Sequence, residues 1–138
     1  MSICFLSLET SKIFNKLILN CLENNGFDGL SEALIVLFPY IDANDKITVS
    51  QLSKQVGYTR QAIHKSIKKL EEFGYITLVL ENQKEKFIHF TPKGEKLMLI
   101  ANEFILEIEN NLEKLIGSKE LANHIKNQMA IYKYLQEK

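Results

Sequence analysis

Residues 48–74 read TVSQLSKQVGYTRQAIHKSIKKLEEFG, and this stretch predicts two short helices joined by a tight turn. Thr48 and Gln51 have the spacing of a capping box, which starts the first helix. Gly57 ends that helix, because glycine readily adopts the left-handed conformation that closes many helices. Thr59 follows as the N-cap of the second helix. Two helices at this spacing are typical of a helix-turn-helix, whose second helix lies in the major groove of DNA.

The second helix is expected to run from Arg60 to Phe73, with Gly74 just beyond its end. Apolar residues recurring at helical spacing predict its inward face. That face comprises Ala62, Ile63, Ile67 and Leu70. No acidic residue interrupts the outward face, which we expect to bind DNA together with the cap residue. The predicted DNA-binding residues of this helix are Thr59, Arg60, Gln61, His64, Lys65 and Lys68.

Arg60 is the favoured base reader, because it is the single arginine among 17 basic residues and a guanidinium fork suits guanine. The Gln61 amide suits adenine, and the lysines suit phosphates. The plainer interpretation is a solvated helix that happens to carry lysines. Net charge argues against it: residues 46–94 hold nine basic and four acidic side chains, a net charge of +5, although the whole chain is neutral. A local positive field of this kind favours a polyanion bound by one face.

Beyond the second helix the sequence changes to β-forming residues. Residues 75–80 and 87–90 predict the two strands of a hairpin, with the polar residues 81–86 between them. Lys84 and Lys86 lie at the tip of this hairpin. We expect them to contact the DNA backbone or the minor groove, as the wing of a winged helix.

Further helices flank this unit on both sides. The first is expected over about residues 10–23, and a short, mostly buried second one follows the cap Ser31, with Pro39 tolerated only near its end. After the hairpin, a helix over residues 92–116 begins with proline, and a last one starts at about Ser118. The apolar face of the helix over 92–116 is wider than a lone hairpin domain would cover. Another surface must therefore pack on it.

Three runs of the sequence resemble the MarR family, the multiple-antibiotic-resistance regulators. They are residues 47–57, residues 70–76 and residues 90–95, which read ITVSQLSKQVG, LEEFGYI and FTPKGE. The order of the predicted elements matches as well, so the resemblance covers nearly the whole chain. The sequence departs from the family pattern in the wing, where residues 82–84 read Asn-Gln-Lys in place of the usual Asp-Arg-Arg.

The resemblance implies a mainly α fold with a small β-hairpin wing, formed by residues 1–138 as one domain. It implies a winged helix-turn-helix at about residues 30–94, and dimerisation helices at residues 1–29 and 95–138. The expected function is that of a homodimeric transcriptional regulator that binds a pseudo-palindromic operator in double-stranded DNA. Residues expected at the dimer interface are Phe14, Leu17, Phe104, Ile108, Leu112, Leu121, Ile125 and Tyr132.

Family members often bind small phenolic or lipophilic effectors, or sense oxidants through a cysteine of the first helix, so a small-molecule effector is a possible partner. Cys21 lies on an apolar stripe without a positive neighbour, which favours a small core residue over a sensor. His64, His89 and His124 lie on separate elements without the spacing of a metal pair, which favours surface or interface histidines over zinc ligands. The sequence therefore predicts neither a metal nor a cofactor.

Composition and motifs narrow the remaining classes. A chain of 138 residues with 46% hydrophobic and 25% charged residues fits one ordinary globular domain. The apolar start at residues 3–6 is too brief for a signal peptide or a membrane span, so we expect a cytoplasmic protein. No phosphate loop or nucleophile motif indicates an enzyme. The serious rival is a winged helix that serves as a protein-interaction or dimerisation module, because one fold hosts both functions. In that case, charge reversal at Arg60 and Lys65 would leave function intact.

Overall fold

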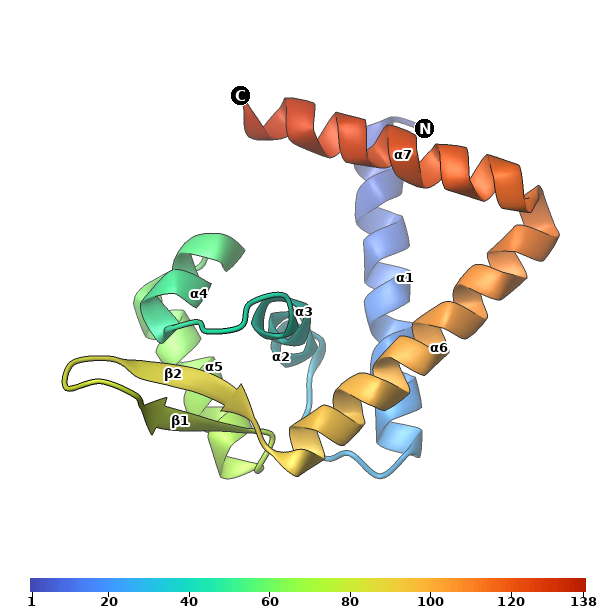
Figure 1. The fold of residues 1–138 in the computed structure, drawn as a ribbon. Coiled ribbons are helices and arrows are strands. Elements are labelled where there is room, and N and C mark those ends of the chain that lie inside the picture. The colour runs from blue at the N-terminus through green and yellow to red at the C-terminus, as the bar shows by residue number, and fades with distance from the viewer. The chain divides into compact units, whose positions relative to one another are not determined.

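The computed structural model describes residues 1–138 as seven helices and one hairpin (Figure 1). In chain order the elements are α1 (Ile3–Asn24), α2 (Glu32–Ile35), α3 (Leu37–Asp42), α4 (Val49–Val56), α5 (Arg60–Glu72), β1 (Ile76–Leu80), β2 (Lys86–Phe90), α6 (Pro92–Ile116) and α7 (Ser118–Gln136). The fold is therefore mainly α with a two-stranded antiparallel wing, as the sequence predicts. The chain divides into two compact units, Met1–Ala101 and Asn102–Lys138, and α6 runs from one into the other.

The predicted start of the first helix is wrong by about two turns. α1 begins at Ile3 rather than near Thr10, because Ser2 acts as its N-cap and accepts the N–H of Phe5 at 3.1 Å. The apolar residues at the very start of the chain are thus helical. α1 ends at Asn24, close to the predicted end at residue 23.

The single short helix predicted after Ser31 is in fact two. Ser31 caps α2 as expected and accepts the N–H of Leu34 at 3.2 Å, but α2 stops at Ile35 and α3 starts at Leu37. Pro39 supplies the physical reason, because it has no N–H to donate to the carbonyl of Ile35. It is accommodated in the first turn of α3, where a missing donor costs little.

The hairpin keeps a regular register. Ile76 pairs with Phe90 and Leu80 pairs with Lys86 across the two strands. The N–H of Ile88 in β2 also donates to the carbonyl of Ile47 at 2.9 Å, which links β2 to the segment before α4. The wing is thereby attached to the helix-turn-helix through its backbone.

The unit Met1–Ala101 has one apolar core that draws on every element it contains. Its fully buried members include Leu22 of α1, Leu52 of α4, Tyr75 before β1 and Leu97 of α6. α5 contributes Ile63, Ile67 and Leu70. Burial of these side chains holds the three helices from α3 to α5 and the hairpin together, since each buried side chain of this size contributes about 1.5–3 kcal/mol.

The unit Asn102–Lys138 consists of the C-terminal part of α6 and the whole of α7, with Gly117 between the two helices at a φ of 97°. Only Leu121 of α7 is buried. None of the helices in the chain combines the length and the apolar character that a membrane span requires.

Candidate nucleic-acid interface

The turn between α4 and α5 is fixed by hydrogen bonds from its own side chains. Gly57 closes α4 with a φ of 85°, in the left-handed region that favours glycine. The buried Ser53 hydroxyl donates a hydrogen bond of 2.6 Å to the carbonyl of Tyr58. Thr59 then caps α5, because its side-chain oxygen accepts the N–H of Ala62 at 3.1 Å. Two short side chains therefore set the direction in which α5 leaves the turn.

A Ser53→Ala variant is expected to lower the free energy of unfolding by about 1 kcal/mol, the usual net value of one hydrogen bond. Urea denaturation of the variant and the parent at one protein concentration measures this difference. Lys54→Ala, on the exposed side of α4, is the matched control and should stay within about 0.5 kcal/mol of the parent. Equal unfolding midpoints for Ser53→Ala and the parent would show that this hydrogen bond does not hold the turn.

α5 presents one continuous polar face to solvent. Because a helix advances about 100° per residue, Gln61, Lys65 and Lys68 lie opposite the buried stripe, and Arg60 and His64 lie along one edge of the exposed arc. All five side chains are exposed, as is the cap residue Thr59. No carboxylate lies on α5 until its last turn. The structure thus brings the predicted reading residues together on one positive face.

Ala62 does not lie where the sequence predicts it. It is exposed rather than inward, because it is about 100° around the helix from Ile63 and so falls outside the stripe of Ile63, Ile67 and Leu70. An alanine at the margin of an apolar stripe has so little apolar surface that its burial contributes little free energy, so it can lie on either side of the margin. The exposed arc of α5 therefore has an apolar position in its first turn.

The tip of the wing is ordered by one asparagine. The side-chain oxygen of Asn82 accepts the N–H of Lys84 at 2.9 Å and that of Glu85 at 2.7 Å, which forms a turn of the kind asparagine favours. Lys84 and Lys86 are both exposed, as predicted. The structure places Lys86 in β2, opposite Leu80, rather than in the loop.

A carboxylate directly after β1 is held by two basic side chains. Glu81 accepts from Lys46 at 3.0 Å and lies 2.8 Å from Nε2 of His89. The hydrogen bond from Lys46, followed by the contact with His89, holds the pKa of Glu81 below its ordinary value. The Glu81 carboxylate therefore stays charged and ties the wing to Lys46 in the segment before α4, while its own charge is compensated locally.

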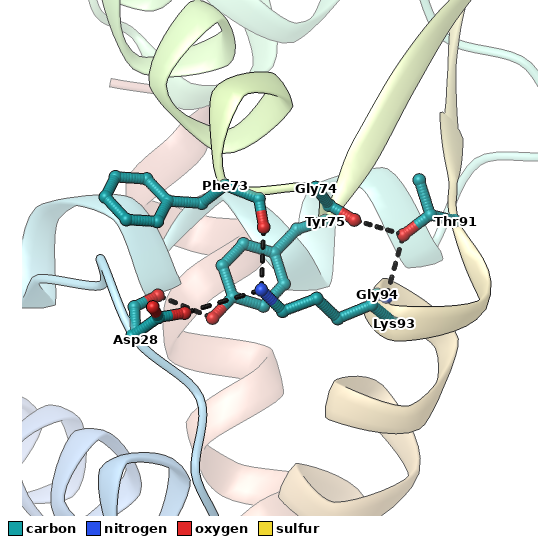
Figure 2. Close-up of polar contacts among 7 residues, drawn as sticks. All are labelled: Asp28, Phe73, Gly74, Tyr75, Thr91, Lys93 and Gly94. Carbon is teal, nitrogen blue, oxygen red and sulfur yellow. Dashed lines mark hydrogen bonds and ion pairs between the residues drawn. The ribbon is translucent and has the colours of Figure 1, made fainter.

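The C-terminal end of α5 is tied to the start of α6 and to the loop after α1 (Figure 2). The ammonium of Lys93 donates to the Phe73 carbonyl at 2.7 Å, lies 3.4 Å from Oδ1 of Asp28 and lies 4.4 Å from the centroid of the Tyr75 ring. The Tyr75 hydroxyl donates to the Asp28 carbonyl at 2.5 Å. Burial above all, and then the Asp28 carboxylate, raise the pKa of Tyr75, so this hydroxyl remains a donor at neutral pH. Lys93 thus connects three segments at one point.

The same joint depends on two glycines and a threonine (Figure 2). Gly74 has a φ of 82°, and its carbonyl accepts the hydroxyl of Thr91, whose oxygen in turn accepts the N–H of Gly94 at 3.1 Å. A β-carbon on Gly94 would collide with the carbonyl oxygen of Tyr75 and press on the Phe90 ring. The motif residues that carry the family resemblance here therefore position α5 and α6 and do not belong to the exposed polar face of α5.

Tyr58 is a further candidate, absent from the residues predicted to bind DNA. Its side chain is 51% exposed, directly before the cap of α5. The available signal was its place between Gly57 and Thr59, since a residue inside so short a turn has no helical face through which to reach the core. The prediction also left out Lys69, which is a further exposed cation of α5.

The residues predicted at a dimer interface differ in how much surface they offer. Tyr132 is 57% exposed, Ile125 is 50% exposed, and Leu17 and Phe14 are 42% and 36% exposed. Phe104, Ile108 and Leu112 are half-buried. Leu121 is only 7% exposed, so it has little surface left for a partner.

Other candidate sites are weaker. A shallow depression of about 370 Å³ on α1 and α2 is lined by Glu9, Lys12, Ile13, Lys16 and Glu32, and Lys12 is paired with Glu9 at 2.9 Å. Cys4 is exposed and Cys21 is half-buried, with the Asn25 amide 3.7 Å from its sulfur. The structure gathers no group of three or more His, Cys, Asp or Glu side chains able to hold a metal ion.

Comparison with known proteins identifies the helix-turn-helix directly. A family model described as winged helix-turn-helix DNA-binding matches residues 40–77, which contain α4, the turn and α5. No curated protein matches the chain.

Solved structures with the same fold extend over the whole chain. Staphylococcus aureus MarR in complex with salicylate and kanamycin has a TM-score of 0.79 and 21% identity, covering 97% of this chain and 91% of that one. Streptococcus pneumoniae FabT in complex with DNA has a TM-score of 0.76 and 22% identity, covering 99% of both chains. S. aureus MepR, a transcription regulator of the multidrug efflux pump MepA, has a TM-score of 0.71 and 19% identity, covering 98% and 99%.

These likenesses confirm the resemblance at the level of the fold: the chain has the winged-helix fold of the MarR-type transcriptional regulators, and its residues 40–77, which contain α4 and α5, match the model described as winged helix-turn-helix DNA-binding.

Proposed function

We propose that the chain is a sequence-specific, double-stranded DNA-binding transcriptional regulator and not an enzyme. We propose further that it acts as a homodimer on a pseudo-palindromic operator. The observation that carries the proposal is the exposed outer face of α5, where basic and amide side chains follow a well-capped helix start without an intervening carboxylate. A helix-turn-helix presents this face to the major groove.

Each side chain of the face has a distinct chemical use in this proposal. The guanidinium of Arg60 offers two parallel donors to the N7 and O6 atoms of guanine, and the Gln61 amide offers a donor and an acceptor to adenine. Lys65 and Lys68 neutralise phosphates and release counterions. The Thr59 oxygen accepts a backbone N–H within α5, which leaves its hydroxyl proton free to donate to a phosphate.

A second copy of the chain is the proposed cover for the apolar surface of the flanking helices. Between them α1, α6 and α7 expose many large apolar side chains, whereas surfaces of single soluble domains rarely gather so many. The most exposed are Ile3, Leu8, Ile13, Leu99, Leu106, Leu115, Tyr132, Tyr134 and Leu135. The first turn of α1, residues 3–6, is apolar all round, a pattern typical of helices that become buried. A dimer would bury these surfaces and carry two α5 helices to one operator.

The solved relatives support the same use of the fold. FabT was solved in complex with DNA, and the MepR F27L mutant was solved bound to an oligodeoxyribonucleotide. S. aureus MarR was solved with salicylate. Release of this chain from DNA by a small-molecule effector stays a prediction, because the depression on α1 and α2 is lined mainly by charged side chains, and Lys12 there is paired with Glu9.

Selection of bound duplexes from a random pool, followed by affinity measurements against salt concentration, tests the proposal. We expect one inverted repeat to be enriched, with an affinity that falls steeply as salt rises because phosphate contacts release counterions. Weak binding to every duplex at low salt would contradict it. That outcome would favour a protein-interaction module, as would unaltered function after charge reversal at Arg60 and Lys65.

Replacing Arg60 by alanine should cost about 1–3 kcal/mol of discrimination at one base position of each half-site. Arg60→Lys is the matched control, because it keeps the charge and removes the bidentate fork, so discrimination should fall while the salt dependence stays. Lys84→Ala or Lys86→Ala should instead weaken all duplexes about equally. Competition assays with operators altered at single positions measure both effects, and identical profiles for Arg60→Ala and Lys84→Ala would refute this division of roles.

A further inference from the structure

The start of α5 carries exposed apolar surface that the fold does not need. Between Phe27 and Met98 the exposed large apolar residues are Tyr58, on the helix-turn-helix, and Val79 and Leu80 on the wing. The carbonyl of Tyr58 is held by Ser53, but its ring is left 51% exposed. Ala62 adds an exposed methyl group in the first turn of α5. Both lie at the end of the helix that a helix-turn-helix inserts into the groove.

The exposed arc of α5 has two chemically different edges. Arg60 and His64 lie along one edge, and Ala62 lies near the other, about 160° around the helix from Arg60. The polar edge can reach the donors and acceptors of base pairs. The other edge offers the Ala62 methyl group, four positions after the exposed Tyr58, and a methyl group makes apolar contacts in place of hydrogen bonds.

The major groove of DNA displays one apolar group, the C5-methyl of thymine, and small or aromatic side chains contact it. We propose that Tyr58 and Ala62 are specificity-determining residues that read thymine methyl groups beside the bases read by Arg60 and Gln61. This inference rests on the proposed function. It assigns to the apolar edge of α5 a preference for thymine over other bases, which phosphate contacts cannot provide. Each half-site should then contain thymines whose methyl groups raise affinity.

The experiment uses the full-length protein and the duplex selected from the random pool. Each thymine of a half-site is replaced in turn by deoxyuridine, which removes the methyl group and keeps the base pair. We expect roughly fourfold weaker binding at one or two positions, the change that corresponds to one methyl-sized group no longer buried. Replacements elsewhere in the duplex should leave the affinity unchanged.

Variants assign each methyl group to its side chain. Tyr58→Ala should reduce the thymine-to-uracil affinity ratio at one position from about four to about one, and Ala62→Gly should do so at another. The ratio compares two duplexes with the same protein, so any loss of helix stability in Ala62→Gly cancels. Leu80→Ala, which truncates an apolar side chain of the wing that is 57% exposed, is the control and should keep both ratios near four.

Tyr58→Phe separates the ring from its hydroxyl. If the ring reads a methyl group, Tyr58→Phe keeps the ratio, and Tyr58→Ala loses it. If Tyr58→Phe and Tyr58→Ala weaken binding alike and leave the ratio unchanged, the hydroxyl contacts a phosphate and the inference is wrong. A parent protein that binds its operator but ignores every uracil replacement would also overturn the inference while leaving the proposed function intact. Absence of binding to any duplex would remove both.

Discussion

Gly94→Ala is expected to lower the free energy of unfolding by about 2–3 kcal/mol, the largest loss among the single substitutions considered for stability. A β-carbon at this position would collide with the Tyr75 carbonyl oxygen, which belongs to the backbone and cannot rotate away. The Phe90 ring would lie 3.1 Å from the new atom, so relief in that direction is also blocked. Either α6 or the start of β1 must move, and both belong to the joint that holds α5.

Urea denaturation at a fixed protein concentration measures this loss, since self-association makes apparent stability depend on concentration. Gly57→Ala is the informative comparison: it has a φ of 85° but open space around it, so it should cost only the conformational penalty of about 1–2 kcal/mol. Lys96→Ala, on the exposed side of α6, controls for helix propensity. A smaller loss in Gly94→Ala than in Gly57→Ala would show that the close approach at Gly94 is readily relieved.

Local signals made much of this fold predictable. The capping box of Thr48 and Gln51 is present with both of its hydrogen bonds, and Thr59 caps α5 as expected. Gly57 and Gly74 both have positive φ, and α6 starts at Pro92. Each of these features depends on a few neighbouring residues, so the sequence alone carries the necessary information.

Features that depend on distant residues could not be predicted in the same way. The joint around Lys93 brings together segments separated by 65 positions, from Asp28 onward, and nothing in the local sequence indicates that contact. Gly94 could not be predicted for a related reason. This position requires glycine because the Tyr75 carbonyl lies close to it, and not because of its own backbone angles. The exposure of Ala62 was missed because one methyl group scarcely affects an apolar periodicity.

The exposed polar face of α5 was predictable for a different reason. The three buried apolar residues of α5 define its inward face. Charged and amide side chains are rarely buried, so Gln61, Lys65 and Lys68 were expected on the opposite, exposed face. The partner that packs on the flanking helices was harder to predict from the sequence. Exposed apolar side chains on α1 and α7 favour a covering partner, and a second copy of the chain is the one proposed.

Ile125→Glu is expected to convert the protein to a monomer and to weaken operator binding by about 100-fold or more. Ile125 is 50% exposed, so a carboxylate there remains hydrated in the single chain and should cost its folding little. In a dimer that buries this face of α7, the same carboxylate would lose its hydration without gaining a partner. Two linked α5 helices bind one operator with an avidity that a single one lacks, commonly by a factor of about 10²–10⁴.

Sedimentation or light scattering measures the oligomeric state, and titration of the selected operator measures affinity. Asn127→Glu is the matched control, because it adds the same charge about 200° further around α7 and should leave a dimer that binds DNA. The control also removes simple repulsion of DNA as an explanation, since both variants change the net charge equally. If Ile125→Glu remains dimeric and binds its operator as tightly as Asn127→Glu does, the face of α7 that carries Ile125 is not the dimer interface. The dimer would then have to form through the exposed apolar residues of α1 and α6, without this face of α7.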